Sequence, residues 1–522
     1  MTLRIRALVT AVVFGLVAIA ARAGAQAPTD ACTEPEAPID PACLPGGTAG
    51  QLQQHLCSYV WIASLCDATA FPDPGYKAGA DPSPALPFQL RAGAVHEHSS
   101  YSDGDPTAIP ADYYRAARTG HNQADEGGDT GVKLDFMLAS EHSDNTQIPI
   151  TTSAACIDTS TGTNLLLPCF HGSDMDHYWK WPASLRQARE ASDASFTGIR
   201  GFEWTNDYFN HMNVYFSTNF SNVKVDGSYL SMDFFWNWLR EPVTEGGGAD
   251  GLVTFNHPGG DPHLTPFDGG FPHTEVLAQF PGGGNWNDLA HVPDVDERVA
   301  GMEVNGGDDI QWYVKALTRG WHIGPLANED EHEREWSSSH EGKTLILTRG
   351  TGPRDYYWAM KNHRTIAIHD PLVGGAPGKK ATFPTMHYYA DGAGINDPAA
   401  TVLGSTIRTP GPHTLRFTGS GLPGFSRLAL ISNRTGGQSA PIQLGTVAED
   451  GTVSVSRSVD SPARGEDWYF VVVCPASGST RCGSDLSYTA VTAPIWLAAP
   501  KTPKGSGASS PRVKVGVRLD LL

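Results

Sequence analysis

Two different hydrophobic patterns divide the chain. Between residues 88 and 375, short apolar stretches such as LDFMLASEH, FTGIRGFEW and GLVTFNHPGG alternate with segments of helical periodicity. From 376 to 500, short alternating runs such as HTLRFTGSG and DWYFVVVC are separated by Gly, Pro, Ser and Thr turns. The first pattern indicates an α/β fold with a parallel sheet, either open or closed into a barrel. The second pattern predicts a smaller antiparallel β-sandwich-like module.

Three segments of the first part have the periodicity of helices. They are residues 111–119, 177–191 and 309–319. The last begins with an aspartate, and Gly320 follows its end, as expected for helix boundaries.

The N-terminal segment has the features of a secretory signal. Arg4 and Arg6 precede an uncharged apolar run over 7–21, and small residues follow it. The run is shorter than the roughly 20 residues that a membrane-spanning helix needs. We therefore expect a signal peptide over residues 1–25 and a protein exported to the periplasm or the extracellular space. No later apolar stretch predicts a membrane span.

Cysteines and turn residues mark the segments that flank the two modules. Residues 26–87 are rich in Cys, Pro, Ala and Gly and predict an N-terminal extension without a large core, whereas 501–522 form a linker and C-terminal tail. The eight cysteines fall in sequence-near pairs: Cys32 and Cys43, Cys57 and Cys66, Cys156 and Cys169, Cys474 and Cys482. Export and the absence of a C-x-x-C pair favour disulfides over metal thiolates, although the connectivity stays open.

The charge balance excludes some partners. Lys and Arg total 37 against 56 Asp and Glu, which gives a formal net charge of −19. Nucleic acids and anionic membranes are bound by basic patches, so neither is an expected partner.

Histidines are concentrated in the α/β part of the chain. Sixteen of the 19 lie between His96 and His369. In HEHSSYSDG, His96 and His98 are two positions apart, so an extended backbone points both imidazoles to the same side, and Asp103 follows closely. The pair could be ordinary surface histidines if it stood alone.

Further histidines and carboxylates recur at the ends of predicted strands, where α/β folds build their sites. They are Glu141 and His142 in ASEH, Glu203 in GFEW, His211 in HMNVYF, His257 in FNHPGG, and Asp330 and His332 in NEDEH. Each could have a structural role, such as a buried ion pair or a turn. Together they predict a site for Zn, Mn or Fe, with more ligands than one tetrahedral ion can use.

The order of these motifs resembles that of the polymerase-and-histidinol-phosphatase (PHP) superfamily. HEHSSYSDG is similar to its first motif, H-x-H-x4-D-G, and the later motifs follow in the same order over residues 88–375. The resemblance implies a distorted (β/α)7 barrel that holds two or three divalent transition-metal ions. The residues that match its ligand positions are His96, His98, Asp103, His142, Glu203, His211, His257, Asp330 and His332, with Glu203 bridging ions.

One departure from the family adds a candidate ligand. Many members have Asp before the histidine of the second motif, where this chain has Glu141, whose longer side chain reaches farther. The stretches GFEWT, HMNVYF and YTAVTAPIW are similar to the exported metallohydrolase branch that includes carbaryl hydrolase.

The implied function is metal-dependent hydrolysis of a small-molecule ester, most typically a phosphoester. A carbamate or carboxylester substrate is the first alternative, and a non-catalytic metal- or glycan-binding protein is the second. Glu141, Asp103 and Glu203 are the candidate catalytic residues, and His322 is a further candidate proton donor whose reach the sequence leaves open. Glu303 and Asn305, in MEVNGG, are candidates to orient the ligands from behind.

Overall fold

The computed structural model describes residues 82–105, 108–123, 128–143, 180–206, 209–221, 223–225, 228–258, 285–306, 309–369, 372–437, 440–477, 482 and 488–500. The predicted signal peptide, most of the N-terminal extension, the C-terminal tail and six of the eight cysteines lie outside these residues. None of the helices in the described ranges combines the length and apolar character that a membrane crossing requires.

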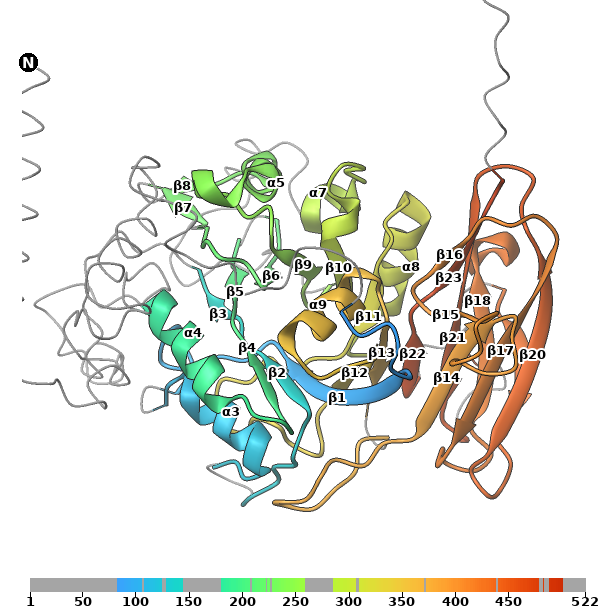
Figure 1. Cartoon of the computed structure of the whole chain (residues 1–522), viewed down its shortest axis with the longest axis horizontal. Coiled ribbons are helices and arrows are strands. Elements are labelled where there is room, and N and C mark those ends of the chain that lie inside the picture. The colour runs from blue at the N-terminus through green and yellow to red at the C-terminus, as the bar shows by residue number, and fades with distance from the viewer. Residues whose placement is uncertain are drawn as a thin grey trace, which may run out of the picture.

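Two mixed sheets carry most strands of residues 88–375 (Figure 1). The first is part of an eleven-stranded sheet, and its strands in this region have the order β4-β2-β1-β12-β13: β1 (Gln89–Val95), β2 (Phe136–Leu138), β4 (Thr197–Ile199), β12 (Lys343–Thr348) and β13 (Thr365–Ile368). The second has the order β11-β10-β9-β6-β5-β3 and consists of β3 (Glu141–His142), β5 (Gly201–Trp204), β6 (Met212–Tyr215), β9 (Leu252–Phe255), β10 (Val299–Glu303) and β11 (Gly324–Leu326). The short strands β7 (Lys224–Val225) and β8 (Ser228–Tyr229) form a separate ribbon.

The two sheets enclose one apolar core. The chain crosses from the first sheet to the second between β2 and β3, and again between β4 and β5. Val95 and Ile346 of the first sheet belong to the same buried cluster as Tyr215, Leu252 and Leu326 of the second. Burial of these side chains is the main source of stability for this part of the chain.

The strand directions correct the prediction of a parallel sheet. Strands β9, β10 and β11 are parallel, but β6 runs antiparallel to both β5 and β9, and β12 runs antiparallel to β1. Only residues 205–211 connect β5 to β6, which is too short for the crossover that parallel neighbours need. The α/β class is confirmed, whereas the closed (β/α)7 barrel is not, because the described strands pair as separate sheets.

The described residues contain fewer helices than a (β/α)7 barrel would require. Those in the described residues are α3 (Pro110–Thr119), α4 (Lys180–Ala191), α5 (Met232–Arg240), α7 (Asn285–Leu289), α8 (Asp309–Arg319) and α9 (Pro353–Lys361), with short 3-10 turns η6 (Val243–Glu245), η7 (Asp296–Arg298) and η8 (Asn433–Thr435). The predicted helices 111–119 and 309–319 agree with α3 and α8. The predicted helix 177–191 agrees with α4 from Lys180 onward, and 177–179 lie outside the described residues.

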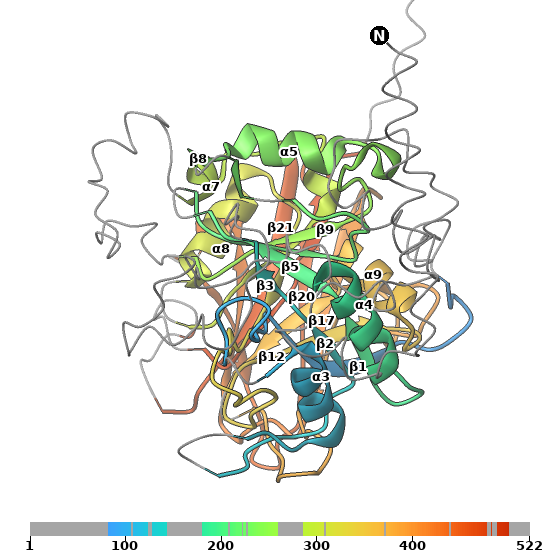
Figure 2. The ribbon, with the colours of Figure 1, turned by 90° about the vertical axis from the view of Figure 1, so that its left-hand side faces the viewer.

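Local sequence explains the limits of α3. Pro110 occupies its first turn, where a missing N–H costs nothing, and the Asp112 carboxylate accepts a hydrogen bond from the Ile109 N–H at 2.9 Å. Gly120 ends the helix with φ of 72°, a conformation that glycine adopts without strain. Figure 2 shows α3 and α4 together on the side of the molecule away from the C-terminal strands.

The C-terminal strands form a sandwich-like module. One of its sheets has the order β15-β14-β17-β20 and contains β14 (Thr385–Ala390), β15 (Thr401–Val402), β17 (Pro412–Ser420) and β20 (Val453–Asp460). The other strands are β16 (Thr406–Ile407), β18 (Arg427–Ser432), β19 (Ile442–Thr446), β21 (Glu466–Cys474), β22 (Ala490–Thr492) and β23 (Ile495–Ala498). Buried residues of both layers, such as Phe417 and Val471, share one cluster, and a disulfide joins Cys474 to Cys482.

The module is joined to the first part by a continuous sheet. Strand β22 pairs with β13 on one edge and with β21 on the other, so Val491 lies between Ala367 and Val472. The eleven-stranded sheet therefore crosses the predicted boundary at residue 376. The β-module completes the sheet of the first part and is more than an appended unit.

This continuity predicts that both parts unfold together. Val491 is fully buried, so Val491→Asp places an unpartnered carboxylate at the junction and should lower the midpoint of one common thermal transition. Ser456→Asp, on an exposed position of β20, is the matched control and should change the midpoint little. Calorimetry that shows two transitions, of which only one shifts in Val491→Asp, would contradict the prediction.

Candidate metal centre

Nine of the ten predicted ligand residues converge at the ends of the strands. His96 and His98 follow β1, His142 ends β3, Glu203 lies in β5, and His257 follows β9. They form four overlapping groups: His98, Asp103, His142 and His332; His96, Glu203 and His257; His96, His98 and Asp330; His142, Glu203 and His211. Within each group the ligand atoms lie within 4.8 Å of one another, as they would around an ion.

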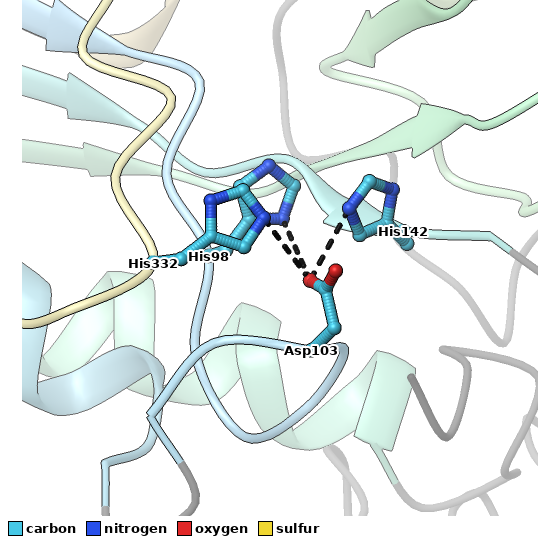
Figure 3. Close-up of side chains that lie close together, drawn as sticks. All are labelled: His98, Asp103, His142 and His332. Atoms are coloured by element: carbon cyan, nitrogen blue, oxygen red, sulfur yellow. Dashed lines mark ion pairs between the residues drawn. The ribbon is translucent and has the colours of Figure 1, made fainter. Parts of the chain in front are cut away.

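The first group surrounds the carboxylate of Asp103 (Figure 3). Its Oδ1 lies 3.2 Å from Nε2 of His142, 3.2 Å from Nε2 of His332 and 3.9 Å from Nδ1 of His98. Although burial works to raise the pKa of Asp103, the adjacent His142, His332 and His98 hold it well below its usual value. Asp103 is therefore an ionised candidate ligand at the partly exposed side of the cluster.

Glu203 is the residue that connects most of the cluster. Its side chain is completely buried, and four imidazoles lie within ion-pair distance of it. The distances from its carboxylate oxygens are 3.1 Å to His96 Nε2, 2.7 Å to His142 Nδ1, 3.2 Å to His211 Nδ1 and 3.3 Å to His257 Nε2. Burial opposes ionisation, yet His96, His211 and His142 hold the pKa of Glu203 well below its usual value. A carboxylate so placed can be shared by two ions.

Asp330 joins the imidazoles of the first motif. Its Oδ1 lies 3.3 Å from His96 Nε2 and 3.2 Å from His98 Nε2. Despite burial, His96 and His98 keep the pKa of Asp330 low. Since His96, His98, His142 and Glu203 each belong to two groups, the arrangement suits adjacent ions that share ligands.

Whether the residues fit metal ions can be judged from two buried imidazole nitrogens. Nε2 of His96 and Nε2 of His98 are buried and make no hydrogen bond of proper geometry, although carboxylates lie close to both. Burial, together with His332 and His142, lowers the pKa of His98 to about 3, which leaves this ring neutral and able to bind an ion. Imidazole and carboxylate donors without thiolate suit Zn, Mn or Fe, so the residues present fit such ions.

Buried carboxylate and amide groups hydrogen bond with the candidate ligands and fix their orientation. His96 Nδ1 lies 2.7 Å from Glu303 Oε1, and the His257 backbone N–H donates to Glu303 Oε2 at 2.6 Å. The Asn256 amide donates to Glu203 Oε1 at 2.7 Å. Glu303 thus has the orienting role expected for the end of β10, and Asn305 hydrogen bonds with Asn328, whose amide lies 3.1 Å from His96 Nδ1.

Three ligands have left-handed backbone conformations that non-glycine residues rarely adopt. The φ values are 72° for His96, 28° for His257 and 50° for Asp330. Such conformations cost about 1–3 kcal/mol each and cluster at functional sites. The backbone is therefore locally less stable at the positions that carry these candidate ligands.

Glu141 does not lie with the ligands, contrary to the prediction. Its carboxylate accepts hydrogen bonds from the Ser99 hydroxyl at 2.5 Å, the Ser99 backbone N–H at 3.0 Å and the Ser102 hydroxyl at 2.6 Å. Adjacent residues of a strand face opposite sides, so the register that turns His142 toward Asp103 turns Glu141 away from it. Neither a ligand role nor a proton-donor role fits this placement.

His322 also lies away from the cluster. Its Nδ1 is 2.7 Å from Asp296 Oδ2 and its Nε2 is 2.6 Å from Glu466 Oε1, the first residue of β21. The imidazole thus links the first part of the chain to the β-module and does not serve as the proton donor that the sequence suggested.

Several supporting residues carried no recognisable signal in the sequence. The Thr205 hydroxyl lies 2.7 Å from His142 Nδ1, and Asn256 and Ser102 make the contacts given above. Thr205 directly follows GFEW, and Asn256 precedes His257, so proximity to a ligand was the one available indication. In a sequence, side chains of this type usually indicate a turn.

Comparisons with known proteins give weak similarities. No protein-family model matches the chain, and no curated protein matches it at a significant level. A two-domain protein from Bacteroides vulgatus that contains a predicted PHP-like metal-dependent phosphoesterase is similar at 14% identity and a TM-score of 0.34, over 80% of this chain and 99% of that chain. PsfC from Pseudomonas syringae is similar at 11% identity and a TM-score of 0.29, over 54% of this chain and 93% of that chain. Similarities this low establish neither the fold nor the activity of this chain.

Because Glu203 is central to the cluster, its substitution should reduce metal binding more than substitution of a peripheral ligand does. Glu203→Gln keeps the shape of the side chain but removes the charge that faces four imidazoles, whereas His257 belongs to one group. After metal reconstitution, Glu203→Gln should retain less bound metal than His257→Gln by elemental analysis. Equal metal content in the two variants, with unchanged circular dichroism, would argue against a shared carboxylate.

The His322 link predicts a pH-dependent contribution to stability. Burial works to lower the pKa of His322, but hydrogen bonds with Asp296 and Glu466 raise it to about 9 from 6.5. A raised pKa stabilises the folded state fully below about pH 6.5 and loses this effect as the pH rises through about 9. His322→Gln should therefore reduce the free energy of unfolding most near pH 6 and least near pH 10.

Denaturant titrations across this range would measure the difference from wild type. Glu466→Gln should remove part of the same pH-dependent difference, because it lacks one of the two carboxylates. A difference that grows with rising pH would show that His322 is not held as the cation.

Proposed function

We propose that the protein is an exported, metal-dependent hydrolase of small-molecule esters, with phosphoesters as the favoured substrate class. The observation that carries this proposal is the convergence of six histidines and three carboxylates into four overlapping ligand groups, two of which contain Glu203. A single structural ion would need about four ligands. A partly exposed cluster of this size is typical of hydrolytic centres in which adjacent ions act on one bond.

The chain's own residues divide into ligands and supports. His96, His98 and Asp330 would hold one side of the cluster, and His142, His332 and Asp103 the other, with Glu203 between them. When bound, divalent ions supply Lewis-acid activation of water and of the ester oxygen. Glu303 and Asn256 keep His96 and Glu203 in place, which preserves the geometry that this chemistry needs.

The substrate class follows from the kind of charge that the reaction develops. Phosphoesters, carboxylesters and carbamates all develop negative charge on oxygen when water attacks, so the same cluster could serve each of them. Resemblance to the PHP superfamily favours phosphoesters, and the resemblance to its exported branch makes carbamate or carboxylester hydrolysis the alternative. A purely metal- or glycan-binding protein would also keep these ligands together, so turnover measurements distinguish it from a hydrolase.

Export is supported by the cysteines within the described residues. Cys474 and Cys482 form a disulfide, and such bonds persist in the periplasm and outside the cell. Together with the N-terminal sequence, this favours an extracytoplasmic protein.

The proposal predicts that the first motif is essential for both metal and activity. His96→Ala combined with His98→Ala should reduce bound metal and bring hydrolysis of aryl phosphate mono- and diesters, acetate and carbamate to background. His121→Ala combined with His340→Ala is the matched control, since both histidines are exposed and lie in none of the ligand groups. The control should hydrolyse at the wild-type rate.

Chelator treatment and reloading with Zn, Mn or Fe would complete the test. Activity that is lost with chelator and restored by one of these ions supports the proposal, and the substrate panel selects among ester classes. Wild-type turnover in the double mutant, or metal-loaded wild-type protein without turnover on any ester, would overturn it.

A further inference from the structure

Glu141 and Ser102 form a buried chain of contacts that ends at a ligand imidazole. The Ser102 hydroxyl donates to Glu141 Oε2 at 2.6 Å, and the same hydroxyl oxygen lies 3.3 Å from His98 Nδ1. Glu141, Ser102 and His98 each expose at most 1% of their surface to solvent. Water therefore does not compete for these contacts.

The directions of these hydrogen bonds fix the proton on His98. The Ser102 hydroxyl donates to Glu141 Oε2, so its hydrogen points toward that carboxylate and its lone pair is left for His98 Nδ1–H. His98 then carries its proton on Nδ1 and presents the Nε2 lone pair, which lies 3.2 Å from Asp330 Oδ1.

This assignment resolves an ambiguity in the ligand groups. His98 belongs both to the group of Asp103 and to the group of His96 and Asp330. Its Nδ1 lies 3.9 Å from Asp103 Oδ1, farther than from Ser102. A hydrogen bond to Ser102 occupies Nδ1, so the ring would bind through Nε2, beside His96 and Asp330.

The same carboxylate also anchors the turn that carries Asp103. Glu141 accepts hydrogen bonds from the backbone N–H and hydroxyl of Ser99, and the Ser99 carbonyl accepts from the N–H groups of Ser102 and Gly104. Asp103 lies inside this turn. One buried carboxylate thus supports ligands of two neighbouring groups.

We propose that Glu141 is a positioning residue that acts through Ser102 to hold His98 in the Nδ1–H form, so that His98 binds its ion through Nε2 beside His96 and Asp330. This inference rests on the proposed function for the presence of the ions, but not on the identity of the ester. It replaces the ligand role that Glu141 was expected to have.

Metal affinity measures this role without reference to catalysis. Loss of an outer hydrogen-bond partner typically weakens metal binding by about 10–100-fold. Competitive titration of the metal-free protein with Zn²⁺ should give such a loss for Ser102→Ala and for Glu141→Gln, with recovery in Ser102→Thr, which keeps the hydroxyl. With Co²⁺, the visible absorption spectrum should change in Ser102→Ala and return toward wild type in Ser102→Thr.

A double-mutant cycle separates a chain of contacts from two independent effects. If Glu141 acts through Ser102 on His98, Ser102→Ala combined with Glu141→Gln should weaken binding much less than the product of the single losses. A fully multiplicative loss would overturn the proposal. Wild-type affinity and spectrum in Ser102→Ala would overturn it too, because His98 Nδ1 would then need no partner.

Glu97→Gln is the matched control. Glu97 lies between His96 and His98 in the sequence and is completely buried, and neither of its carboxylate oxygens has a hydrogen-bond partner among the described residues. The charged groups that act most strongly on its carboxylate are Glu329, Glu331 and Lys343 and not the two imidazoles, so Glu97→Gln should keep wild-type metal affinity. A loss equal to that of Glu141→Gln would mean that any buried acid near the motif gives this effect, and would contradict a specific role of Glu141.

These outcomes are distinguishable from failure of the proposed function. A protein that binds Zn²⁺ with the expected non-multiplicative losses but hydrolyses no ester would retain the positioning role and refute the hydrolase. A hydrolase whose Ser102→Ala and Glu141→Gln variants bind metal as wild type does would retain the function and refute the positioning role.

Discussion

The ionised carboxylate of Glu203 is the constraint on which the rest of the centre depends. A completely buried anion is costly unless opposite charges or ions surround it, and here four imidazoles lie around one side chain. Each imidazole belongs to a different strand end or loop. The charge of Glu203 therefore couples the ligand cluster to the arrangement of both sheets.

The fold meets this constraint by bringing distant segments to one place and fixing them from behind. His96 and Asp330 adopt left-handed backbone angles, and Glu303, Asn256 and Thr205 hold individual ligands through hydrogen bonds. Burial of the apolar core shared by the two sheets stabilises the fold and offsets the free-energy cost of these backbone conformations. The β-module contributes to that stability because β22 extends the same sheet beyond β13.

The sequence is most informative where a functional residue lies within a few residues of the end of a buried strand. His96, His257 and Asp330 could be predicted because each polar side chain follows an apolar run, and those runs meet in space. Glu141 was misassigned because it and His142 are adjacent on β3, and only the register decides which of them faces the cluster. The antiparallel β6 and the pairing of β22 with β13 depend on long-range contacts, which leave no periodic signal along the chain.

Metal-edge X-ray absorption spectroscopy of the reconstituted protein would test the central claim most directly. A shared Glu203 predicts a first shell of imidazole nitrogen and carboxylate oxygen without sulfur, together with metal–metal scattering at about 3.5–4 Å. Loss of the metal–metal feature in Glu203→Gln would follow from the same account. A single isolated ion in the wild-type protein, or a sulfur-containing shell, would contradict it.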